Sequence, residues 1–116
     1  MKNDFKRSIS IYGSEFWDFY NKLSIPTQTK VDWVIDLLKT LKIVPDKYFK
    51  HIEGAKGLYE IRVKVGNNIF RIFCFFDKEN LVILLNGFQK KTDKLPKNEI
   101  KKAEKLKAQY YEDKKK

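Results

Sequence analysis

The 116-residue chain has one cysteine and one histidine, and each scarcity excludes a class of chemistry. Because Cys74 is alone, one chain forms no disulfide and no cysteine-based zinc site, and we interpret this residue as a small member of the core. Because His51 is alone, a ribonuclease that works with two histidines is excluded. The carboxylates are scattered along the chain, which argues against a metal-dependent nuclease.

Long apolar runs and glycine-rich phosphate loops are also missing. No segment approaches the ~18 apolar residues of a membrane span. The N-terminus alternates polar and apolar residues, unlike a signal peptide. No GxxxxGKS-type sequence is present, and no serine has the context of a nucleophile elbow. We therefore expect a cytoplasmic protein with no metal, small-molecule cofactor or membrane partner.

Positive charge and aromatic side chains are abundant. Lys and Arg number 25 against 15 Asp and Glu, a net charge of +10, and residues 89–116 hold eleven lysines against five acids. The composition is 42% hydrophobic and 15% aromatic, which predicts one folded domain over residues 1–116. The charge favours a nucleic acid or an acidic partner, although a soluble domain with a lysine-rich tail would have the same composition.

Hydrophobic periodicity predicts a strand and two helices in the first part of the chain. Alternation over residues 8–12 is typical of a short strand. A helix of about three turns follows, and Pro26 closes it. A second helix begins near Thr27 or Thr29 and is ended by Pro45.

The second part of the chain predicts a loop, three antiparallel strands and a helix. Residues 46–56 are typical of a loop. Period-two alternation and turn residues indicate three consecutive strands between residues 57 and 91. After Pro96, a highly charged segment over residues 97–116 has the narrow apolar stripe of a final helix. The predicted fold class is therefore a small α+β domain of order β-α-α-β-β-β-α.

Turn lengths predict a cationic face on this sheet. With Asn67 and Asn68 as the first hairpin loop, Lys64 lies opposite Arg71, and Arg62 points the same way. With Lys78 and Glu79 as the second loop, Arg71 pairs with Asn86, and Phe88 falls on the same face. The other face is apolar and is expected to pack against the two helices.

Two arginines on one face can hold a phosphate, since guanidinium forks match two oxygens at once. Phe73, Phe88 or Tyr48 can stack a base. In RNA the 2′-hydroxyl can attack the neighbouring phosphate, so a protein need only position the groups and stabilise charge. Arg62 alone is more often a solvated strand residue, whereas Arg71 stands among apolar neighbours and is unusual.

Three motifs recur together in a known family. They are Gly57-Leu58-Tyr59-Glu60-Ile61-Arg62, a strand with a single Arg71, and Asn86-Gly87-Phe88-Gln89-Lys90-Lys91 before Pro96. In this order the chain resembles the RelE/ParE toxin superfamily, and within it the HigB-like, phage-associated branch. The resemblance implies a RelE-like fold, with a twisted antiparallel sheet, two N-terminal helices packed on one face and a C-terminal helix.

The resemblance also implies a function and a set of site residues. It implies the toxin of a type II toxin–antitoxin system, a ribosome-dependent endoribonuclease that cuts mRNA by 2′-hydroxyl attack and is neutralised by an antitoxin, often a helix-turn-helix protein. The implied catalytic residues are Arg62, Arg71 and Lys90. The implied RNA-binding residues are Lys64, Phe88, Lys91 and Lys94, and no metal is implied.

Two positions depart from the patterns of relatives, and two other functions stay open. Glu60 stands where RelE proteins often have a basic residue, and Asn86 where HigB-like proteins often have histidine. A catalytic tyrosine near the C-terminus has no firm match in Tyr110 or Tyr111. The alternatives are a ParE-like DNA gyrase inhibitor that cleaves nothing, and an inactive relative that binds only its antitoxin or nucleic acid.

Overall fold

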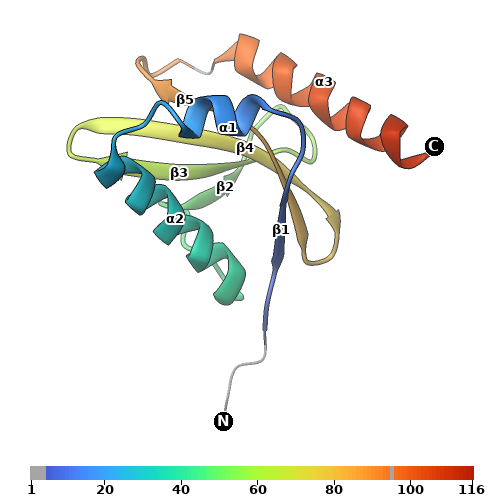
Figure 1. Cartoon of the computed structure of the whole chain (residues 1–116), viewed down its shortest axis with the longest axis horizontal. Coiled ribbons are helices and arrows are strands. Elements are labelled where there is room, and N and C mark those ends of the chain that lie inside the picture. Colours follow the sequence, from blue (N-terminus) through green and yellow to red (C-terminus); the bar gives the residue numbers. More distant parts are fainter. Residues whose placement is uncertain (1–4, 95) are drawn as a thin grey trace.

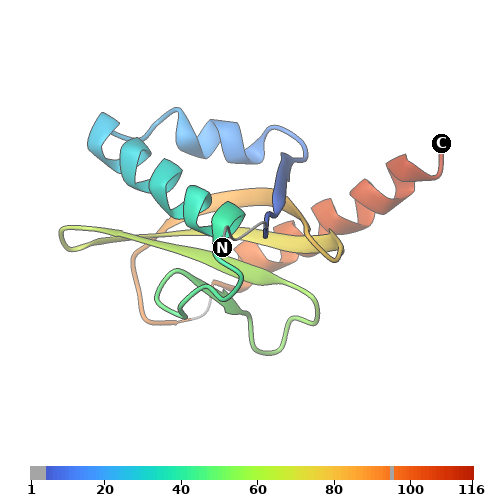
Figure 2. The ribbon, with the colours of Figure 1, turned by 90° about the horizontal axis from the view of Figure 1, so that it is seen from below.

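The computed structural model describes residues 5–94 and 96–116 and contains a five-stranded sheet with helices on both faces. The elements in chain order are β1 (Ser8–Ile11), α1 (Glu15–Tyr20), α2 (Ile25–Thr40), β2 (Phe49–His51), β3 (Tyr59–Val65), β4 (Asn68–Lys78), β5 (Leu81–Lys90) and α3 (Lys97–Lys114). The strand order is β1-β5-β4-β3-β2. Helices α1 and α2 cover one face, and α3 lies against the other (Figures 1 and 2).

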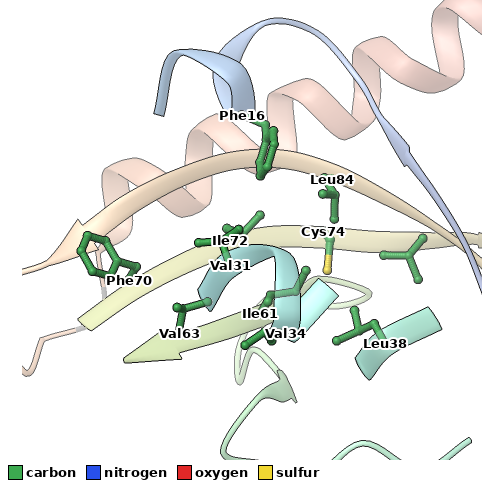
Figure 3. Packing of buried hydrophobic residues seen from close by; sticks show 11 residues of the cluster. Phe16, Val31, Val34, Leu38, Ile61, Val63, Phe70, Ile72, Cys74 and Leu84 are labelled. Atoms are coloured by element: carbon green, nitrogen blue, oxygen red, sulfur yellow. The ribbon is translucent and has the colours of Figure 1, made fainter. Parts of the chain in front are cut away.

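The face under α1 and α2 is apolar, as the sequence predicts. Alternate residues of β3 and β4 point toward Val31, Val34 and Leu38 of α2, and Figure 3 shows these side chains interleaved. Phe16 of α1 closes the same cluster. Cys74 lies in this core and is fully buried, which raises the pKa of its thiol and makes it a packing residue.

The opposite face has a second core, which α3 covers over only part of its area. Ala103 is the buried residue of α3, and it packs with Phe73, Phe75 and Leu85 of the central strands. The segment after β2 adds Ile52, Ala55 and Leu58 to the same cluster. The narrow apolar stripe predicted for the last helix is therefore enough to dock it, while its charged residues face solvent.

The boundaries of the first two helices differ from the sequence prediction. Helix α1 has six residues instead of about three turns, and Pro26 lies inside the first turn of α2. Ser24 is the N-cap of α2, and its Oγ accepts a hydrogen bond from the Thr27 backbone N–H at 3.3 Å. Proline is tolerated at this position because the N–H that it lacks has no partner in a first turn. Helix α2 also ends at Thr40, five residues before Pro45.

The sheet has one more strand than predicted and one parallel pair. Residues 49–51, inside the expected loop, form β2 and pair with β3. The sequence did not predict this strand because three residues are too few to show an alternation of polar and apolar side chains. All neighbouring strands are antiparallel except β1 and β5, which run parallel. The predicted α+β fold class is confirmed, while the direction of β1 could not follow from its alternation.

Gly87 of β5 allows α1 to lie close to the sheet. A Cβ atom built at this position would be 2.4 Å from Cδ2 of Phe19, well inside contact distance. The aromatic ring therefore occupies the space that any other side chain would need. Phe19 in turn contacts Phe70 of β4, with ring centroids 6.3 Å apart.

Candidate nucleic-acid interface

The uncovered part of the second face carries basic residues in two neighbouring rows. Strand pairing aligns residues across β3, β4 and β5, so that aligned side chains point to the same face. The rows are Arg62–Arg71–Phe88 and, beside it, Lys64–Ile69–Lys90. Two guanidinium groups therefore start from directly opposed positions on adjacent strands, with an aromatic ring next in line.

The predicted face is confirmed, but the predicted partners are wrong. The first hairpin loop is Gly66-Asn67, because Gly66 takes a positive φ of 59° and Val65 pairs with Asn68. Arg71 consequently lies opposite Arg62 instead of Lys64. The register moves by two residues, and a shift of two keeps every side chain on its face.

On β5 the partner of Arg71 is Phe88 and not Asn86. The second loop is one residue later than predicted, and the pairing is irregular between Ile72 and Cys74. Asn86 is buried against α3, where its Nδ2 donates to the backbone O of Glu99 at 3.1 Å and to Glu99 Oε1 at 3.0 Å. This side chain attaches the first turn of α3 to the sheet.

Glu60 joins the two arginines. Its Oε2 is 3.3 Å from Nε of Arg62, and its Oε1 is 3.5 Å from Nε of Arg71. Glu60 and Arg62 are two residues apart on β3 and so share a face. Within the described part of the chain, no other carboxylate forms an ion pair with either arginine.

Arg71 is a buried charge that lacks a full set of partners. Its side chain is 7% exposed, and its Nη1 donates to the backbone O of Phe70 at 3.2 Å. Among the described residues, its buried Nε has no hydrogen-bond acceptor. Burial lowers the pKa of Arg71, Glu60 opposes that change, and the positive charge of Arg62 adds to it. Such a site favours a further anion.

Arg62 is held from the loop before β2 and is more open to solvent. Its Nη1 donates to the backbone O of Asp46 at 3.1 Å, and its backbone N–H donates to the O of Tyr48 at 2.8 Å. Its side chain is 30% exposed, compared with 7% for Arg71. Of the two arginines, Arg71 is therefore buried on the sheet face and Arg62 is partly exposed to solvent.

The arginines border an open hollow of about 230 Å³ whose charged lining residues are all cations. They are Lys47, Arg62, Lys64 and Arg71, with Val63 and Ile69 completing the lining. A second hollow of about 450 Å³ shares Lys47, Arg62 and Lys64 with the first and extends to Lys30 and Tyr48. Lys47 belongs to this surface although the sequence motifs did not select it.

The other predicted residues line two neighbouring hollows. Lys90 and Lys91 border one of about 300 Å³, which shares Ile69 with the arginine hollow. Phe88 and Lys94 border one of about 740 Å³ with the first turn of α3. The structure therefore brings Arg62, Arg71 and Lys64 together and places the remaining four in two other hollows, at the end of β5 and just after it.

Four residues considered from the sequence lie away from this surface. Phe73 is 1% exposed and cannot stack a base, but its ring contacts that of Phe88 edge to face at 5.1 Å and supports it. His51 pairs with Tyr59, whose side chain belongs to the face covered by α1 and α2. Tyr110 and Tyr111 pack on Phe75, toward the other end of β4.

Tyr110 has a structural role at that other end. Its hydroxyl donates to Oδ2 of Asp77 at 2.7 Å, and Nζ of Lys114 lies at the same distance from the same oxygen. The hydrogen bond to Asp77 is the main reason that the pKa of Tyr110 rises to about 12. Six residues of extended strand, about 20 Å, separate Asp77 from Arg71.

Glu60 and Lys47 are the site residues that sequence reasoning missed. The alternation of Glu60 with Arg62 could have placed its carboxylate beside the arginines, since residues two apart on a strand share a face. Lys47 had no comparable pattern, because it reaches the site from an irregular segment. In the described ranges, no group of three or more His, Cys, Asp or Glu side chains could hold a metal ion. Over the same residues, no helix combines the length and apolar character needed to cross a bilayer.

The sheet topology and its helices define a RelE-like fold, and solved structures share it. A mutant of the E. coli toxin RelE in the free state has a TM-score of 0.62 at 12% identity, with 87% of this chain and 97% of that chain covered. The archaeal RelE from Pyrococcus horikoshii OT3, solved as a RelE–RelB complex, has a TM-score of 0.51 at 14% identity, covering 72% and 93% of the two chains. These likenesses confirm the predicted fold.

Residues 18–108 match the family model described as "Phage derived protein Gp49-like (DUF891)". The chain therefore belongs to the phage-derived Gp49-like family. Among curated proteins, none matches it in sequence. The RelE-like, phage-associated resemblance seen in the motifs is confirmed, while the finer assignment to the HigB-like branch stays a prediction.

Proposed function

We propose that this protein is the toxin of a type II toxin–antitoxin system and cuts mRNA on the ribosome without a metal ion. The observation that carries the proposal is the opposed pair Arg62 and Arg71, one of them buried with an unsatisfied donor, above a hollow with cationic lining. Two guanidinium groups that line one hollow suit a phosphate and the extra negative charge of a phosphorane.

The surrounding residues suit an RNA strand. Phe88 stands next to Arg71 in the strand register and borders the hollow of about 740 Å³, where a base can stack on its ring. Lys64, Lys90, Lys91 and Lys94 extend the positive surface on both sides and can follow the sugar–phosphate backbone. In this arrangement Lys90 stands one row from the arginines and stabilises negative charge at the cleaved phosphate.

Ribosome dependence and an antitoxin belong to the same proposal. An open hollow holds a flexible RNA weakly, and a ribosome that presents the mRNA in a fixed conformation removes that cost. An antitoxin, of the helix-turn-helix class by the sequence resemblance, would neutralise the toxin in the cytoplasm. A RelE–RelB pair is the state in which the archaeal relative was solved.

The test is mRNA cleavage in a translating cell-free system, with ribosome-free RNA as a control. Wild-type protein should cut within translated codons, and Arg62→Ala should cut at least about 100-fold more slowly, since it removes a donor to the phosphate. Lys78→Ala, which removes one exposed positive charge from the other end of β4, is the matched control and should cut normally.

Two results would overturn the proposal. Intact mRNA in the presence of folded wild-type protein would remove the nuclease function, and inhibition of gyrase supercoiling would then identify the alternative. Equal cutting by wild type and Arg62→Ala would show that the arginine pair is not the reacting site.

A further inference from the structure

We propose that Glu60 is the proton acceptor of the cleavage step, a role that rests on the function proposed above. RNA cleavage by its own 2′-hydroxyl needs a group that takes the hydroxyl proton, in addition to groups that bind the phosphate. Glu60 lies between the two arginines, with one carboxylate oxygen near each Nε atom. Its side chain is 17% exposed, so it is held beside the arginines but is still reachable from solvent.

The contacts of Glu60 leave part of each guanidinium available. Glu60 lies near the Nε atoms, and each Nη1 atom donates to a backbone oxygen. The hydrogen bonds that the two guanidinium groups donate within the described residues come from Nη1 atoms and leave the Nη2 atoms free to donate. A phosphate can therefore bind the Nη2 atoms while Glu60 keeps its position, and the two anions share one pair of cations.

Other side chains near the arginines are poor proton acceptors. The remaining charged residues that line the hollow are Lys47 and Lys64, and lysine at neutral pH is a cation without a free lone pair. The sole histidine belongs to the opposite face, and the C-terminal tyrosines belong to the far end of β4. Glu60 is the carboxylate that meets the geometric requirement.

Basic residues also surround the carboxylate on the strand that follows in the sheet. Lys50 of β2 is the partner of Glu60 in the strand register, next to the two arginines. The position of Glu60 is therefore inside the cationic part of the sheet that would hold the phosphate.

The step balances without any further reagent. The 2′-hydroxyl proton moves to a carboxylate oxygen of Glu60 as the 2′-oxygen forms its bond to phosphorus. The bond from phosphorus to the 5′-oxygen breaks, and its electron pair leaves with that oxygen. Solvent supplies the proton of the new 5′-hydroxyl, and Glu60 returns its own to solvent. The products are a 2′,3′-cyclic phosphate and a 5′-hydroxyl end.

The experiment measures single-turnover cleavage of mRNA bound in programmed ribosomes. Glu60→Gln removes the proton-accepting carboxylate and should cut about 10²–10⁴-fold more slowly than wild type. Glu60→Asp keeps a carboxylate and should recover part of that loss. Glu79→Gln, at the tip of the β4–β5 hairpin, is the matched control and should behave as wild type.

Binding separates a base from a residue that only holds the arginines. With mRNA that carries a 2′-O-methyl group at the cut nucleotide, Glu60→Gln should bind programmed ribosomes within about threefold of wild type. Thermal unfolding confirms that each variant is folded. A loss of binding as large as the loss of rate, or no recovery of rate by Glu60→Asp, would overturn the proton-acceptor role.

The proposal and the function on which it rests fail in different ways. If wild type and Glu60→Gln cut mRNA equally, the role of Glu60 is wrong and the nuclease function stands. If wild-type protein cuts no mRNA, both are wrong.

Discussion

The two ends of strand β4 each carry a nearly buried charge, and the two charges differ in how completely they are paired. At one end the Asp77 side chain is 6% exposed and accepts hydrogen bonds from Tyr110 and Lys114, both at 2.7 Å. At the other end the Arg71 side chain is 7% exposed, and its nearest carboxylate oxygen is 3.5 Å away, with a buried N–H left unsatisfied. Burial is the same, and only the completeness of the partner set differs.

The difference separates a structural charge from a binding one. The Asp77 end is closed by α3, whose residues supply its partners, so there the charge attaches a helix. The Arg71 end opens on a hollow lined by cations, so there the charge has capacity for an anion from outside. Burial or charge alone would not distinguish them, and the four predictions below test the distinction.

The largest effect is expected from Arg71→Lys. Lysine keeps the positive charge but presents a single ammonium in place of a planar fork, so it cannot hold two phosphate oxygens in the same way. Cleavage of ribosome-bound mRNA should fall about 100-fold or more, measured in a single turnover. Near-normal cleavage by this variant would mean that charge, without the fork, is sufficient at this end.

Asp77→Asn should lower the stability of the fold but leave mRNA cleavage within about twofold of wild type. The hydrogen bonds from Lys114 and Tyr110 hold the pKa of Asp77 below its ordinary value of 3.8. Its stabilising contribution is therefore present above that value and is lost as the pH falls below it. Thermal unfolding from pH 2 to 7 should show the two proteins diverging above about pH 4.

Tyr110→Phe tests the same closed end from the alkaline side. The pKa of Tyr110 is raised to about 12, so the folded protein holds this proton more tightly than the unfolded chain, whose value is 10.0. The contribution is complete below pH 10 and is lost as the pH rises toward 12. Melting temperatures at pH 8–12 should fall less steeply for the variant, and parallel curves would contradict the assignment.

The smallest effect is expected from Lys91→Ala or Lys94→Ala. Each removes one cation from the rim of the open end, where contacts with phosphates are exposed to salt. Binding of a fluorescent single-stranded RNA should weaken a few-fold, and the slope of log affinity against log salt should decrease by about one. Lys42→Ala, after α2, is the matched control and should leave the slope unchanged.

The sequence was sufficient for the order of every element except β2 and for the identity of the basic face. Alternation fixed which side of β3 and β4 each residue occupies, and at Arg71 both register errors were shifts of two, which preserve that side. The motifs also selected Arg62, Arg71 and Phe88 correctly as neighbours in space, although not as one row.

The features that the sequence could not predict depend on contacts between distant segments. The partner of Asn86 is a backbone oxygen in α3, and the loop before β2 supports Arg62 through backbone atoms that any residue has. Pro26 was assigned to a helix end because proline suits both an end and a first turn, and only the Ser24 cap decides between them. The sequence also could not show that Phe73 is buried in the second core and so is unable to stack a base.

The close fit of Gly87 beneath Phe19 bears on how a genetic screen of this protein should be interpreted. In a selection for variants that no longer stop growth, substitutions at Gly87 would be recovered beside those at Arg71, because any side chain there displaces the α1 layer. Such survivors would contain little folded protein, whereas Arg71 survivors would accumulate normally. Immunoblots of the surviving colonies would therefore separate damage to the scaffold from damage to the chemistry.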